Sequence, residues 1–126
     1  MGIKQDWMER QIEEMGDTMA AVLFGKKRLK KVFDKFAENN QEDKNQEIDQ
    51  IVMDVLVNSY VKKGDFTKAE ETLFSFAKNQ KTLYVFQSAL LFYNKLLEMD
   101  DKKLNSYGFS KEKINQSIER LMGLYS

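Results

Sequence analysis

Carboxylate side chains that lie close together in the sequence are the first candidates for chemistry, because paired carboxyl groups can act as general acid and general base. The chain offers four such pairs: Glu9 with Glu13, Glu13 with Glu14, Glu70 with Glu71, and Asp100 with Asp101. All of them fall on polar faces or at the ends of expected helices. We therefore expect these carboxylates to be solvated and not catalytic.

The chain contains no histidine and no cysteine. Without histidine there can be no Ser-His-Asp or Cys-His arrangement and no Glu-x-x-His motif of a di-metal helical bundle. Without cysteine there is no disulfide framework, no thiolate zinc site and no cysteine nucleophile. The six glycines are isolated, which excludes a glycine-rich phosphate-binding loop. The expectation is a protein without enzymatic activity, cofactor or bound metal.

Composition is typical of a globular domain. The 126 residues are enough for one domain, with 42% hydrophobic and 32% charged residues. Basic and acidic residues number 20 each, so the neutral total gives no general attraction to nucleic acid. No apolar run approaches the ~20 residues that span a bilayer, and no signal-peptide pattern starts the chain, so we expect a cytoplasmic protein.

The elements that position the polar groups are expected to be helices. The chain has no proline, is rich in helix-forming residues, and lacks the long apolar–polar alternation of a strand. We predict an all-α bundle of five or six helices in one domain, residues 1–126. Its parts would be N-terminal helices in 1–38, a polar loop in 39–46 and a helical-hairpin body in 47–126.

The hairpin at Ile51–Asn79 organises this prediction. Its first helix carries apolar residues on more than one side, which favours a place at the centre of the bundle. Gly64 ends this helix, and the segment from Thr67 to Glu70 fits the S/T-x-x-E capping box that would start the next one. A turn this short makes the two helices antiparallel.

The hairpin resembles one tetratricopeptide repeat through the pattern L-x3-Y-x3-G-D-[YF]-x2-A, here Leu56, Tyr60, Gly64-Asp65-Phe66 and Ala69. The sequence departs from the family at Met53, where tryptophan is common, and at Val57, where a small residue is common. The resemblance implies stacked helical hairpins and a peptide-binding groove along the polar side of the first helix. Carried over by position, that row is Asp54, Asn58 and Lys62.

The chemistry of this row is also suited to a peptide. The Asn58 amide is flanked by the carboxylate of Asp54 and the ammonium group of Lys62, so donors and acceptors lie together. Asp54 stands where carboxylate-clamp repeats use lysine, so the resemblance does not imply a ligand with a free C-terminal carboxylate. A solvated stripe without a ligand is the alternative interpretation.

The first helix is expected from Asp6 to Phe24, with Gly25 ending it. Trp7 either closes the core as a lid or is an exposed anchor. The apolar residues of this helix form one seam: Met8, Ile12, Met15, Met19 and Val22, with Leu23 alongside. The seam faces either the bundle or a second copy of the chain, so a homodimer through the first helix is one expected partnership.

Three short segments near the N-terminus carry a second resemblance: Gln5-Asp6-Trp7, Arg10-Gln11-Ile12 and Leu23-Phe24-Gly25-Lys26. They resemble the start of a family of small, uncharacterised proteins from Gram-positive bacteria, in which a repeat-like helical body follows. The family has no assigned activity. The resemblance therefore implies a bacterial source and a helical fold, and it supplies no catalytic residue.

A dense basic run follows the first helix and consists of Lys26, Lys27, Arg28, Lys30 and Lys31. It supports an alternative function, electrostatic binding of nucleic acid or of a membrane surface. The other interpretation is a solvated face beside the C-terminus of the first helix, where cations are favoured. Apolar residues from Leu29 to Ala37 then predict a short second helix.

Two further helices complete the prediction. The first runs from Thr82 to Met99, and the pair Asp100-Asp101 at its C-terminal end should fray because carboxylates oppose the helix dipole there. Ser110 is expected to cap the last helix. Its buried face would be Ile114, Ile118, Leu121, Met122 and Tyr125.

These patterns predict a non-enzymatic protein-interaction module whose partner is an unidentified protein or peptide. The alternative, an electrostatic binder using the basic run, would lose affinity steeply as salt rises. A carboxylate-dependent turnover would instead indicate an enzyme.

Overall fold

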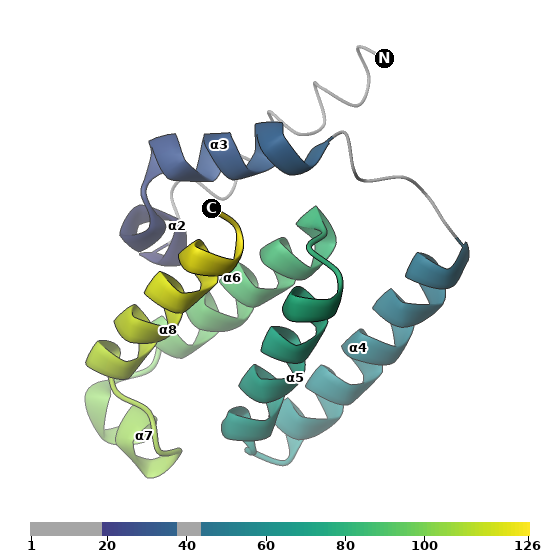
Figure 1. Ribbon diagram of the computed structural model, residues 1–126. Helices are drawn as coiled ribbons and strands as arrows, with labels where there is room; N and C mark the ends of the chain where they lie inside the picture. The colour runs from purple at the N-terminus through teal and green to yellow at the C-terminus, as the bar shows by residue number, and fades with distance from the viewer. Residues whose placement is uncertain (1–18, 38–43) are drawn as a thin grey trace.

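The computed structural model describes residues 19–37 and 44–126, and in these ranges every regular element is an α-helix. The helices are α2 (Met19–Phe24), α3 (Lys26–Ala37), α4 (Lys44–Lys62), α5 (Phe66–Asn79), α6 (Leu83–Leu97), α7 (Asp101–Ser106) and α8 (Lys111–Leu124) (Figure 1). The all-α prediction is confirmed for this part of the chain. The short α7 lies between the last two predicted helices and is an additional helix that the sequence analysis does not predict.

The centre of the bundle is α6, which packs against α2, α3, α5 and α8. Its buried residues are Leu83, Val85, Phe86, Ala89, Leu90, Phe92, Tyr93, Leu96 and Leu97. The prediction that the helix beginning the hairpin is central is wrong. That helix, α4, lies at the edge beside α5 (Figure 1). The physical reason is that α4 carries charged residues along its length, whereas Lys95 is the one charged residue within α6.

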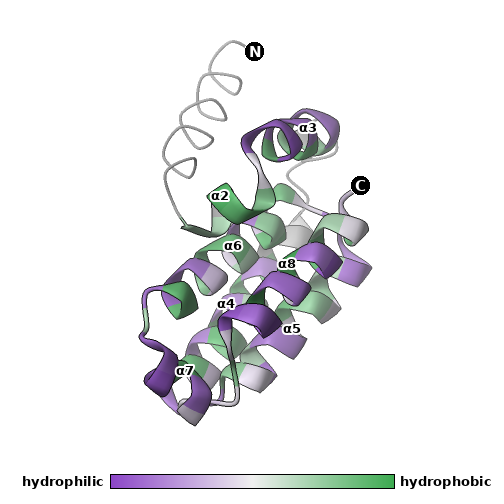
Figure 2. Ribbon diagram, turned by 90° about the vertical axis from the view of Figure 1, so that its left-hand side faces the viewer, coloured by the Kyte–Doolittle hydropathy of each residue, from purple (hydrophilic) through white to green (hydrophobic). Residues whose placement is uncertain are grey.

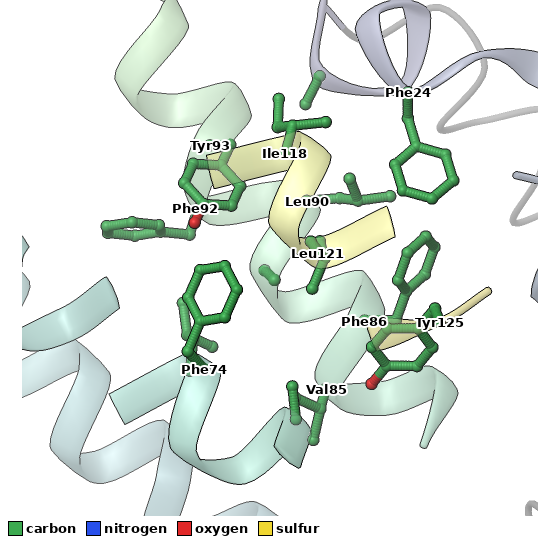
Figure 3. Close-up of a cluster of buried hydrophobic side chains, with 14 of the residues drawn as sticks. Phe24, Phe74, Val85, Phe86, Leu90, Phe92, Tyr93, Ile118, Leu121 and Tyr125 are labelled. Carbon is green, nitrogen blue, oxygen red and sulfur yellow. The ribbon is translucent and has the colours of Figure 1, made fainter. Parts of the chain in front are cut away.

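Aromatic rings join the N-terminal helices to the end of the chain. Phe86 of α6 packs edge-on against Phe24 of α2, with 5.1 Å between ring centroids, and lies 4.8 Å from the ring of Tyr125 (Figure 3). The Tyr125 hydroxyl donates a buried hydrogen bond of 2.8 Å to the carbonyl oxygen of Thr82. The last turn of the chain is thereby fixed to the start of α6.

The turn between α4 and α5 uses a different cap from the predicted one. Gly64 has φ +76°, and Asp65 is the N-cap, with its carboxylate accepting a 3.2 Å hydrogen bond from the Lys68 amide. Thr67 already lies inside α5, so the predicted capping box is wrong. Asp65 follows the turn directly and is as good a cap as threonine, so the helix begins at the first available cap.

The remaining helix ends test the other predictions. Ser110 caps α8 as expected, and Thr82, predicted as the first residue of a helix, is the N-cap of α6. α6 ends at Leu97, before the predicted end at Met99, and Asp100 is the N-cap of α7, where it accepts a 2.8 Å hydrogen bond from the Lys103 amide. The predicted 39–46 loop is also too long, since α4 begins at Lys44, while residues 38–43 lie outside the described ranges.

Candidate functional site

Two opposite faces of α4 are apolar. On the side packed against the core, Met53 is completely buried, and Val57, Tyr60 and Val61 are half-buried. The other side carries five exposed aliphatic side chains: Ile48 58%, Ile51 63%, Val52 46%, Val55 63% and Leu56 38%. Because residues advance by about 100° around a helix, Met53 and Val55 point about 200° apart. The core covers one face of α4 and leaves the other in solvent.

The predicted row of Asp54, Asn58 and Lys62 lies along one border of this exposed face. The three residues follow at intervals of four and share one side of the helix. Asn58 and Lys62 are exposed, whereas Asp54 is half-buried and accepts a hydrogen bond from the Tyr84 hydroxyl at the start of α6. Asp54 thus helps to hold α4 in place, and Asn58 and Lys62 have their side chains in solvent.

A second side-chain hydrogen bond holds the first half of α4. Asp49 accepts it from the amide of Gln80, which follows α5. At the Tyr84 contact, burial first and the Asp54 carboxylate second raise the pKa of the Tyr84 hydroxyl to about 12. The tyrosine therefore remains a protonated donor at neutral pH. These two contacts define which side of α4 faces the core and which side is left open.

The described end of the predicted first-helix seam is also exposed. Met8, Ile12, Met15 and Trp7 lie outside the described residues, but Met19, Val22 and Leu23 of α2 are 51%, 62% and 45% exposed. They border a pocket of about 320 Å³ together with Leu97 and two residues of α8. The hydrophobic colour of α2 is visible in Figure 2.

The predicted basic run is exposed on the first two turns of α3. Arg28 and Lys31 line an open pocket of about 490 Å³ between α3 and the end of α8, whereas Lys26, Lys27 and Lys30 are not among its lining residues. Lys35, one turn further along α3, lines the same pocket. Sequence reasoning missed this pocket, although the spacing of Arg28, Lys31 and Lys35 would have indicated a common side of the helix.

The catalytic carboxylate candidates that fall within the described residues have structural partners or lie in solvent. Glu70 accepts a 2.8 Å hydrogen bond from the Tyr93 hydroxyl, while Glu71 is exposed. Asp100 caps α7, and Asp101 lies 3.6 Å from the ammonium nitrogen of Lys111. Glu9, Glu13 and Glu14 fall outside the described residues. Among the residues that the structure describes, no three acidic side chains gather in a way that could hold a metal ion.

None of the helices within 19–37 and 44–126 is both long and apolar enough to cross a bilayer. A family model matches residues 2–126, and its description reads "Family of unknown function (DUF6483)". No curated protein and no solved structure is significantly similar to the chain.

Proposed function

The chain belongs to DUF6483, a family of unknown function, and we propose that it is a non-enzymatic protein-interaction module that docks through the exposed face of α4. The observation that carries this proposal is the row of five exposed aliphatic side chains opposite Met53. Monomeric proteins rarely leave a contiguous apolar patch of more than a few hundred Å² uncovered, and such patches are typical of binding surfaces.

The spacing of these side chains indicates how a partner would engage them. Ile48, Ile51, Val52 and Val55 stand at positions i, i+3, i+4 and i+7, and Leu56 extends the row. This is the anchor pattern of an amphipathic helix that enters a hydrophobic groove. The partner we propose is therefore a different protein with an apolar groove, into which α4 inserts while α5 holds it from behind.

The polar border of the face would set the orientation of the partner. Lys62 supplies an exposed ammonium group, and Asn58 supplies an amide that can both donate and accept. We propose that the groove has an acidic or carbonyl-rich rim on the side that meets these two residues. Asp54 contributes to partner binding only indirectly, by holding α4 in place, because its carboxylate accepts a hydrogen bond from the Tyr84 hydroxyl.

The tetratricopeptide-like interpretation belongs to the same proposal. Phe66 and Ala69 of α5 are buried, and Gly64 makes the tight turn with a positive φ. In repeat proteins each hairpin buries its outer face against a neighbouring hairpin. Leu56, which is 38% exposed, lies on the face that such a neighbour would cover. This supports the exposed face of α4 as the binding surface, with the partner occupying the position that a neighbouring hairpin has in a repeat protein.

Site-specific cross-linking in cells of the native organism tests the proposal. A photoreactive amino acid at Val55 should give a cross-linked product with a distinct protein, whereas the same residue at Leu91 of α6 should not. Leu91 is a matched control because it is an exposed aliphatic residue, 58% accessible, on a different helix. With the identified partner purified, Val55→Lys should weaken binding about tenfold or more, and Leu91→Lys should leave it unchanged.

Two results would contradict the proposal. Equal cross-linking from both positions would mean that the face has no specific partner. Cross-links only between two copies of this chain, together with a dimer in solution that Val55→Lys dissociates, would assign the face to self-association. A dimer that is instead lost on Val22→Lys would place self-association on the α2 seam.

The alternative candidate, electrostatic binding through Lys26, Lys27, Arg28, Lys30 and Lys31, has one observation in its favour. All five side chains are exposed on a single helix. Phosphate binding by these residues would weaken steeply between low and physiological salt. Docking through aliphatic side chains of α4 would change little over the same range, so a salt series separates the two candidates.

A further inference from the structure

The pocket between α3 and the end of α8 joins an apolar floor to a cationic rim. The floor consists of Phe24, Val32, Met122 and Tyr125, each no more than 6% exposed. Arg28, Lys31 and Lys35 come from one side of α3, and Glu119 of α8 is the acidic residue among the lining side chains. Among the lining side chains, three are cationic and one is acidic.

Two of the three cations that line the pocket, Arg28 and Lys31, have unfilled capacity for an anion. The guanidinium of Arg28 donates to the sulfur of Met122 at 2.8 Å, and a thioether is a weak acceptor. Neither Arg28 nor Lys31 forms an ion pair with a carboxylate in the part of the chain that the structure describes. By contrast, the Lys35 ammonium group already donates to a backbone oxygen of Ser126 at 2.8 Å.

The size and the lining of the pocket suit a small ligand. Its volume of about 490 Å³ falls in the range of roughly 300–1,000 Å³ that is usual for small-molecule sites. Such sites combine an apolar lining with a few polar groups that fix orientation. The planar guanidinium group of arginine can donate two parallel hydrogen bonds to two oxygens of a carboxylate or phosphate. The ammonium group of lysine attracts the same anions only as a point charge.

From these observations we infer that the α3–α8 pocket binds a small amphipathic anion, with a carboxylate or phosphate head held by Arg28 and Lys31 and an apolar body resting on Phe24, Val32 and Met122. This site is separate from the exposed face of α4, so the inference does not depend on the proposed docking function.

Four probes test the inference: the naphthyl compounds 2-naphthoate, 2-naphthyl phosphate and neutral 2-naphthol, which share one apolar body, and inorganic phosphate, which has none. Binding is followed by the amide NMR signals of Val32, Gly123 and Tyr125, which belong to the pocket lining. The two amphipathic anions should bind in a saturable way, and the tighter of the two identifies the preferred head group. Naphthol and inorganic phosphate should each bind about tenfold more weakly or not at all, because each lacks one half of the recognised chemistry.

Two double variants that remove equal charge distinguish binding in the pocket from general attraction of anions to α3. Arg28→Gln/Lys31→Gln should weaken the amphipathic anions about tenfold or more, whereas Lys26→Gln/Lys30→Gln removes the same charge beside the pocket and should change affinity less than about twofold. Thermal melts verify that both variants are folded. Equal weakening by the two variants, or binding of naphthol as tight as that of naphthoate, would overturn the inference. Absence of saturable binding of both anions to the wild-type protein would also overturn it.

Discussion

The Tyr93 hydroxyl donates a 2.8 Å hydrogen bond to Oε2 of Glu70, and this contact joins the central helix α6 to α5. Tyr93 is 1% exposed, and burial followed by the Glu70 carboxylate raises the pKa of its hydroxyl far above the ordinary value. The hydroxyl is therefore a permanent donor. A residue that the sequence suggested as a helix cap or as half of a carboxylate pair is instead a tertiary contact.

A double-mutant cycle measures that contact. Tyr93→Phe should lower the free energy of unfolding by about 1 kcal/mol, because it removes one hydrogen bond and keeps the ring. The same substitution in a Glu70→Ala background should cost less, giving a coupling energy of about 0.5–1.5 kcal/mol in urea titrations. Strict additivity of the two changes would show that the bond does not contribute to stability.

Stability measurements on α4 can verify which of its faces is buried. Met53→Ala should cost about 2–5 kcal/mol, because the side chain is completely buried and its removal leaves a cavity. Val55→Ala should stay within about 0.5 kcal/mol, because 63% of the residue is exposed. Chemical denaturation of the isolated protein provides both values. The reverse order would mean that α4 is rotated relative to the described structure.

Gly64 and Gly123 form a matched pair for a backbone prediction. At Gly64 the φ of +76° is unfavourable for alanine, and an added Cβ would lie 3.2 Å from Cε1 of Tyr107. Gly64→Ala should therefore destabilise the protein by about 1–2 kcal/mol. Gly123 lies in α8 with open space around it, so Gly123→Ala should be neutral or stabilising by up to about 1 kcal/mol. Thermal melts that show equal shifts for the two variants would contradict this account of the α4–α5 turn.

Alkaline pH should weaken the contact between α6 and α4. An unfolded tyrosine ionises near pH ~10, whereas burial and Asp54 raise the pKa of Tyr84 to about 12. Between these values the unfolded state binds fewer protons than the folded state, so the free energy of unfolding falls as pH rises. Tyr84→Phe should make this decline shallower, and Asp54→Asn should give an intermediate slope. Melting temperatures measured from about pH 9 to pH 12 would refute the prediction if all three slopes were equal.

Local sequence patterns predicted the helices and much of the core. Ser110 is recognisable as a cap, and the buried apolar residues of α6 and α8 follow from apolar periodicity alone. The sequence pattern does not determine whether Asp65 or Thr67 is the N-cap of α5, because both residue types can cap a helix. The position of the turn selects Asp65.

Arrangement in space was harder to predict than the elements themselves. An apolar stripe on α4 indicates a surface that packs against another apolar surface. The stripe alone does not indicate whether that second surface belongs to the same molecule or to a partner. The prediction placed α4 at the centre for that reason, and the structure leaves one of its two stripes open. The α3–α8 pocket escaped prediction because Arg28 and Met122 are 94 residues apart, and no local pattern relates them.

The edge position of α4 has a consequence for how the molecule opens. α6 shares contacts with four helices, so its amides can exchange with solvent only when most of the core opens, whereas α4 rests mainly on α5. Amide hydrogens of α4 should therefore exchange through a partial opening that leaves the rest of the bundle closed. A partner that covers α4 would suppress this partial opening, and protection gained in α4 alone would report its binding without any change in the core.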